Sequence, residues 1–255
     1  MTIHEFGDRG GKTVVLIHPS LVMWDYFEYV IPLLEQDFHV VVPALPGYDP
    51  DGQGDFTSIE EIAAELEDRL LQTGCGEVAC MYGCSMGGSV AVRMLADRRL
   101  NICSAVIDGG ITPYQLPRLL TRCIAVRDFL MICMGKLGGL RLLEKAFAAD
   151  DYSEDDLQYL AKVLRSLSVR TIWRTFDSCN NYTMPEPVQV DCPAVEYWFT
   201  DAEEQARKWD ISYIQKQIPQ TRFRQIRNLG HGGMAPLRPE QFARAIRKLA
   251  ANSAE

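Results

Sequence analysis

Short apolar runs rich in β-branched residues alternate along this chain with amphipathic stretches of helical spacing. A run such as Thr13-Val14-Val15-Leu16-Ile17-His18 is nearly all apolar, as expected of a strand buried on both faces of a sheet. The predicted strands span residues 13–18, 38–42, 77–82, 102–108, 194–200 and 221–226, with a candidate edge strand at 3–6. The predicted helices span residues 59–70, 85–97, 203–218 and 239–250. Because strands that alternate with helices pair in parallel through right-handed crossovers, we predict an α/β fold with a doubly wound, mostly parallel sheet.

One long stretch breaks this alternation. Residues 112–193 have helical patterning and contain no convincing strand. We therefore predict that residues 1–111 and 194–255 form one α/β core and that residues 112–193 are a helical cap inserted into it. The length of 255 residues suits one domain of this class together with such an insertion.

The charge balance argues against two classes of partner. The formal net charge is −8, so the chain has no field that attracts nucleic-acid phosphates or anionic lipid. No run approaches the roughly 18 apolar residues of a membrane span, and residues 1–11 lack the apolar region of a signal peptide. We therefore expect a cytoplasmic protein whose partner is a small-molecule substrate.

Neither the cysteines nor the acidic residues indicate a cofactor. The eight cysteines include no C-x-x-C pair and several lie in apolar runs, so we interpret them as reduced, buried thiols. The acidic run from Asp150 to Asp156 is more typical of a solvated helix start than of a metal site. Nothing in the sequence implies a metal or an organic cofactor.

The sharpest local signal is Gly83-Cys84-Ser85-Met86-Gly87, which follows a predicted strand and opens a predicted helix. A serine on such a tight turn is held with its oxygen pointing out of the sheet, and glycines on both sides let the strand and helix backbones pass closely. This context predicts that Ser85 is a nucleophile.

A serine nucleophile needs a general base and an acid that orients it. Of the four histidines, His231 is the best base candidate, because it lies in a glycine-rich loop after the last predicted strand. Asp201 and Glu203 both follow the strand at 194–200, and Asp108 ends the preceding strand. All three carboxylates are candidates for the acid.

Acyl transfer also requires donors for the negative charge that develops on the carbonyl oxygen. The Met86 N–H, at the start of a helix, is one candidate. The second should come from the loop after the first core strand, where Pro19 has no N–H and Ser20 is the next residue that has one. His18, at the end of that strand, is interpreted as a scaffold for this loop.

The arrangement resembles the α/β-hydrolase family over nearly the whole chain. The resemblance rests on the nucleophile elbow, the Ser…acid…His order, the G-H-G loop around His231, and Pro43-Ala44-Leu45-Pro46-Gly47-Tyr48 in place of the family's D-x-P-G-x-G loop. The family commonly shows W-G-x-x-D for the acid. In Trp198-Phe199-Thr200-Asp201-Ala202-Glu203, Glu203 has the x-x-D spacing if Thr200 replaces the glycine, whereas Asp201 directly follows the strand. We favour Glu203, with Asp201 second and Asp108 third.

The resemblance implies a serine hydrolase or esterase that forms an acyl-enzyme on Ser85. We expect a carboxylic ester of modest size, with Leu21 and Trp24 forming a wall of the substrate pocket. A C–C hydrolase or lyase, or a small-molecule receptor without turnover, are the alternative functions on the same fold. The apolar residues of the cap also make a homodimer face possible.

Overall fold

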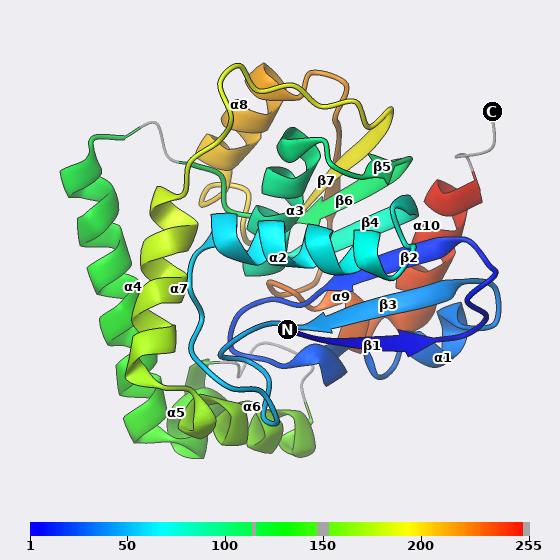
Figure 1. The fold of residues 1–255 in the computed structure, drawn as a ribbon. Coiled ribbons are helices and arrows are strands. Elements are labelled where there is room, and N and C mark those ends of the chain that lie inside the picture. Colours follow the sequence, from blue (N-terminus) through cyan, green and yellow to red (C-terminus); the bar gives the residue numbers. More distant parts are fainter. Residues whose placement is uncertain (114–115, 147–152, 252–255) are drawn as a thin grey trace.

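An eight-stranded sheet covered by helices on both faces forms the body of the computed structural model, which describes residues 1–113, 116–146 and 153–251 (Figure 1). The strands are β1 (Thr2–Phe6), β2 (Thr13–Ile17), β3 (His39–Ala44), β4 (Glu77–Cys84), β5 (Asn101–Ile102), β6 (Ser104–Asp108), β7 (Ala194–Thr200) and β8 (Arg222–Ile226). Their order is β1-β3-β2-β4-β6-β7-β8, and the short β5 pairs with β4. Only β1 is antiparallel to its neighbour, so the predicted doubly wound, mostly parallel sheet is confirmed.

The helices that connect these strands include several that the sequence patterns did not indicate, in particular the short ones near residues 24–34 and 234–237. The described helices are η1 (Trp24–Phe27), α1 (Ile31–Leu34), α2 (Ile59–Gln72), α3 (Met86–Asp97), α4 (Arg118–Gly138), α5 (Leu140–Ala146), α6 (Glu154–Ser166), α7 (Val169–Asn181), α8 (Lys208–Gln217), α9 (Met234–Leu237) and α10 (Pro239–Ala251).

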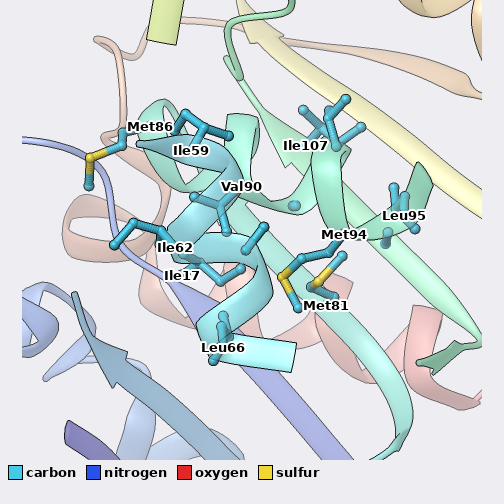
Figure 2. Packing of buried hydrophobic residues seen from close by; sticks show 14 of the residues in the cluster. Ile17, Ile59, Ile62, Leu66, Met81, Met86, Val90, Met94, Leu95 and Ile107 are labelled. Atoms are coloured by element: carbon cyan, nitrogen blue, oxygen red, sulfur yellow. The ribbon is translucent and has the colours of Figure 1, made fainter. Parts of the chain in front are cut away.

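Alternate residues of the central strands feed two apolar cores, one on each face of the sheet. In β2, Val15 and Ile17 belong to the core beneath α2 and α3, whereas Val14 and Leu16 belong to the core beneath α1 and α10. Figure 2 shows the first of these cores, with side chains from α2 and α3 packed over the strands. An apolar run with no polar face is therefore required wherever both sides of a strand are covered.

Helix α2 begins at a cap that the sequence contains. The Ser58 hydroxyl accepts a hydrogen bond from the Glu61 amide at 3.2 Å, which satisfies one of the free N–H groups of the first turn. The carboxylate of Glu60 instead accepts from the amide and hydroxyl of Thr183, and so joins α2 to the chain that leads back into the sheet.

Helices α4–α7 lie between β6 and β7 in the sequence and gather beside the sheet, at the left and bottom of Figure 1. They contact the rest of the molecule at buried positions. The Tyr48 hydroxyl lies 2.9 Å from Thr175 Oγ1 on α7, and the Phe56 amide donates to Thr171 Oγ1 on the same helix. The division of the chain into a core and a cap at residues 112–193 stays a prediction.

The predicted helix at 203–218 starts later than expected, because α8 begins at Lys208. Residues 201–206 form turns instead. In these turns the Glu203 carboxylate folds back and accepts hydrogen bonds from the backbone N–H and the hydroxyl of Thr200. Glu203 is thereby kept in the loop after β7.

Two further expectations concern membrane spans and cysteines. Among residues 1–113, 116–146 and 153–251, the structure has no helix both long and apolar enough to cross a membrane. All eight cysteines are free thiols, and five are buried. Cys123 on α4 is exposed, contrary to the interpretation of the cysteines as buried groups.

Candidate active site

Ser85 occupies the tight turn between β4 and α3, with a backbone φ of 51° and ψ of −113°. This φ lies in the region that side chains disfavour, as expected of a strained turn. The flanking glycines are required by packing, because a Cβ at Gly83 would overlap the carbonyl oxygen of Gly87, and one at Gly87 would overlap that of Ile17. The Ser85 amide donates to the Asp108 carbonyl at 2.8 Å, which fixes the turn to β6.

The structure brings His231 and Glu203 together. His231 Nδ1 lies 2.5 Å from Glu203 Oε1. Because a carboxylate only accepts, Nδ1 carries the proton, and Nε2 of a neutral ring is left as an acceptor. The pair rests against the backbone of Gly109, where an added Cβ would lie 2.9 Å from the His231 ring.

Glu203 is held as an anion by its neighbours. Burial by itself would raise its pKa, but the hydrogen bond and charge of His231, the charge of Arg207 and the Thr200 hydroxyl outweigh burial and lower the pKa to about 2. Its two oxygens divide these contacts, since Oε2 accepts from Thr200 while Oε1 accepts from His231 and from Arg207 at 3.4 Å.

The sequence reasoning missed two groups that support this pair. Arg207 also donates to Asp210 at 3.2 Å, and Asp210 in turn accepts from the backbone and hydroxyl of Thr112. The spacing of Arg207, four residues after Glu203 and three before Asp210, was the available signal. The hydroxyl of Tyr26 donates to the Gly232 carbonyl and so holds the loop that carries His231; no sequence spacing indicated that contact.

The other two candidate acids have different partners. Asp201 is exposed and accepts hydrogen bonds from the amides of Ala202 and Asn228. Asp108 is buried, and its Oδ2 accepts from the Tyr82 hydroxyl at 2.6 Å. Burial raises the pKa of Asp108 to about 6.

The loop after β2 is braced by His18. Its Nδ1 donates to the Pro19 carbonyl at 2.8 Å, and its Nε2 accepts from the Leu45 amide at 3.4 Å. Burial lowers the pKa of His18 to about 4, so the ring is neutral near pH 7, as this pair of bonds requires. The loop then passes through Leu21, whose φ of 70° is left-handed.

A cavity of about 570 Å³ connects these parts. Ser85, His231 and Glu203 line it together with Ser20 and Leu21. The described hydrogen bonds include none between Ser85 and His231, and such bonds are often long until substrate is bound. Met86 buries its side chain in the core and begins α3, where its N–H has no partner within the helix.

The structure does not place Trp24 at this cavity. Its ring stacks on His4, with the ring centroids 3.9 Å apart, and lies against Phe6. The cavity wall expected there is built by Tyr26 and Tyr29, from the next turn of the chain. Trp24 therefore packs η1 against the edge strand β1.

No three of the described His, Cys, Asp and Glu residues are grouped so that they hold a metal ion. Within the acidic run, Glu154, Asp155 and Asp156 form the first turn of α6, capped by Ser153. Asp150 and Asp151 lie outside the described residues.

A profile of the alpha/beta hydrolase family matches residues 14–245. The match covers most of the sequence, and the chain belongs to this family. The expected resemblance and the α/β-hydrolase fold are thereby confirmed.

Solved structures share this fold at low sequence identity. A thermophilic esterase from Thermogutta terrifontis has a TM-score of 0.74 at 18% identity, with 100% of this chain and 94% of the esterase covered. MenH from S. aureus has a TM-score of 0.77 at 14% sequence identity, with 99% of each chain covered. Epoxide hydrolase CorEH has a TM-score of 0.76 at 20% sequence identity, with 98% of this chain and 94% of the epoxide hydrolase covered. Because one fold hosts different reactions, the residues of the site, and not the fold, determine which reaction a member catalyses.

Proposed function

We propose that this protein is a serine hydrolase that cleaves a carboxylic ester of a small molecule. The observation that carries the proposal is the 2.5 Å contact between His231 Nδ1 and Glu203 Oε1 in a cavity that Ser85 also lines. A serine hydroxyl is a weak nucleophile until a base removes its proton, and a neutral imidazole oriented by a carboxylate is such a base. Membership of the hydrolase family and the esterases among the structural neighbours support the same chemistry.

In the proposed first step, the Ser85 oxygen attacks the ester carbonyl carbon while His231 Nε2 accepts the hydroxyl proton. The bond to the alcohol oxygen then breaks, and His231 donates its proton to the departing alcohol. Water attacks the acyl group with His231 again as the base, which releases the carboxylic acid and restores Ser85. Glu203 stays ionised throughout, consistent with its low pKa, and stabilises the imidazolium.

The N–H groups of Met86 and Ser20 are proposed to bind the oxyanion. Both lie beside the serine: Met86 follows it at the start of α3, and Ser20 lines the same cavity. Donors fixed in a turn and a helix terminus need no rearrangement as charge develops. Leu21 is proposed to contact the apolar part of the substrate. No metal or organic cofactor takes part in this scheme.

The test is intact mass after exposure to a fluorophosphonate probe, which phosphonylates activated serines. We expect one adduct on the wild type and none on Ser85→Ala, with labelling of His231→Ala slowed at least about 100-fold because its base is missing. The matched control is Ser89→Ala, one turn along α3, whose hydroxyl donates to the Ile111 carbonyl. An unlabelled wild type, or full labelling of folded Ser85→Ala, would refute the proposal.

A further inference from the structure

Four carboxylates besides Glu203 line the cavity that holds Ser85. They are Asp25, Glu28, Asp155 and Asp156. Among the described residues that line the cavity, none is a lysine or an arginine. The site is therefore strongly negative beyond the catalytic pair.

These carboxylates face the cavity from two walls that are distant in the sequence. Asp25 and Glu28 belong to η1 and its end, whereas Asp155 and Asp156 lie in the first turn of α6. Tyr29 lies in the field of both walls. The charge of Glu28 raises the pKa of its hydroxyl, and burial and the charges of Asp156 and Asp155 raise it further.

These carboxylates have local partners, but among the described residues none of the four forms an ion pair with a cation. Asp156 completes the capping box of α6 with Ser153, and Asp155 is favourable beside the helix N-terminus. Asp25 accepts from the Tyr159 hydroxyl across the cavity. Glu28 accepts a hydrogen bond from the neighbouring Tyr29 hydroxyl and adds a further charge to the same space. Like charges gathered around a cavity repel one another, and a bound cation relieves that repulsion.

The remaining lining suits an organic cation. Tyr26, Tyr29 and Tyr159 line the same cavity as the carboxylates, and aromatic faces attract ammonium groups. An apolar part is formed by Leu21, Leu143, Leu160 and Leu164. We infer that the substrate is an ester that carries a positively charged ammonium group, bound between η1 and α6 while its carbonyl lies at Ser85. This inference rests on the proposed function and specifies its substrate class.

The test compares choline butyrate with 3,3-dimethylbutyl butyrate, in which a carbon replaces the charged nitrogen. Turnover is followed by acid release, because the exposed Cys123 would react with thiol reagents. We expect the wild type to prefer the cationic ester by about tenfold in kcat/KM at low ionic strength, and the preference to fall severalfold at about 0.5 M salt. Calorimetric binding of both esters to Ser85→Ala gives a readout that is independent of turnover.

The variants separate local charge from overall charge. Glu28→Gln combined with Asp155→Asn should lower the preference to about twofold. The control is Glu240→Gln combined with Asp191→Asn, which removes the same net charge from two exposed carboxylates paired with arginines, and it should keep the wild-type preference.

The outcomes distinguish the two proposals. Ser85-dependent turnover of both esters with equal kcat/KM would overturn the inference and leave the proposed function standing. The inference is also overturned if the Glu28/Asp155 variant keeps the full preference. If neither ester is cleaved while Ser85→Ala binds the cationic ester at least about tenfold more tightly, the ester-hydrolase proposal loses support and the cation site stands.

Discussion

The two carboxylate oxygens of Glu203 have different hydrogen-bond partners. Oε2 is held by Thr200, while Oε1 faces His231 and Arg207. An acid fixed from behind in this way presents one oxygen to the imidazole in a defined direction. The exposed Asp201, two residues earlier, accepts hydrogen bonds from backbone amides, and the described hydrogen bonds include none between it and the His231 ring. We therefore expect Glu203 to be the acid.

Glu203→Gln tests this assignment. The glutamine amide can keep the Thr200 bonds, but its NH2 then faces Nδ1 and selects the tautomer whose Nε2 carries the proton. That tautomer is unable to accept the serine proton, so kcat on an accepted ester should fall about 10³-fold or more. Asp201→Asn is the matched control and should stay within about threefold of wild type. The reverse pattern in steady-state assays would identify Asp201 as the acid.

The strand–turn–helix unit of β4 and α3 depends on glycine because three backbone segments meet there. Gly83 lies against the carbonyl of Gly87, Gly87 lies against that of Ile17, and Gly88 lies against the backbone of Gly110. These neighbours are backbone atoms, which move only if strands β2, β4 and β6 shift with them. A methyl group at Gly83, Gly87 or Gly88 therefore cannot be accommodated without a shift of the backbone.

Two alanine substitutions should have opposite effects on stability. Gly83→Ala should destabilise the protein by about 3 kcal/mol or more, because the clash is with backbone. Gly135→Ala, in α4, has its nearest neighbour 3.9 Å away at a Leu164 methyl group, and should stabilise by about 0.5–1 kcal/mol through helix propensity. Denaturant unfolding measures both changes. A neutral Gly83→Ala would show that the turn relaxes more easily than its packing implies.

At the scale of the whole molecule, the free energy of unfolding depends on whether the buried carboxylate of Asp108 is ionised. Asp108 is the last residue of β6 and is buried, and its carboxylate accepts a hydrogen bond from the Tyr82 hydroxyl. Burial raises its pKa from 3.8 to about 6, so the folded state binds this proton more tightly than the unfolded chain does. The stability that Asp108 contributes is therefore complete below about pH 3.8 and is lost as the pH rises through about 6.

Asp108→Asn should remove this pH-dependent loss. The asparagine does not ionise, and its oxygen can still accept from Tyr82. The stability of the variant relative to wild type should therefore rise by about 1 kcal/mol between about pH 5 and about pH 8. Urea unfolding at the two pH values measures the difference, and Asp201→Asn controls for the loss of one negative charge. A difference that stays constant with pH would contradict the buried-carboxylate interpretation.

Local residue patterns determined the sheet, its main helices and the position of the elbow. A strand covered on both faces has to be apolar throughout, as in β2, and a turn crowded by backbone has to contain glycine, as at Gly83 and Gly87. The sequence also predicted that Ser85, His231 and the candidate acids lie at one edge of the sheet, because parallel strands bring their carboxyl ends together there.

Contacts between distant segments were decided only by the tertiary structure. The sequence left Glu203, Asp201 and Asp108 as alternatives, since all three follow strands at the same edge, and only folding sets which carboxylate lies 2.5 Å from His231. Helix α8 begins at Lys208, five residues later than the sequence pattern predicted, and the Glu203 side chain bonds back to Thr200 in the turns before it. Trp24 packs on His4 instead of lining the cavity, and η1 and α6 bring four carboxylates around one space. Hydrogen-bond geometry and charge depend on three-dimensional distance, which the spacing of residues along the chain does not fix.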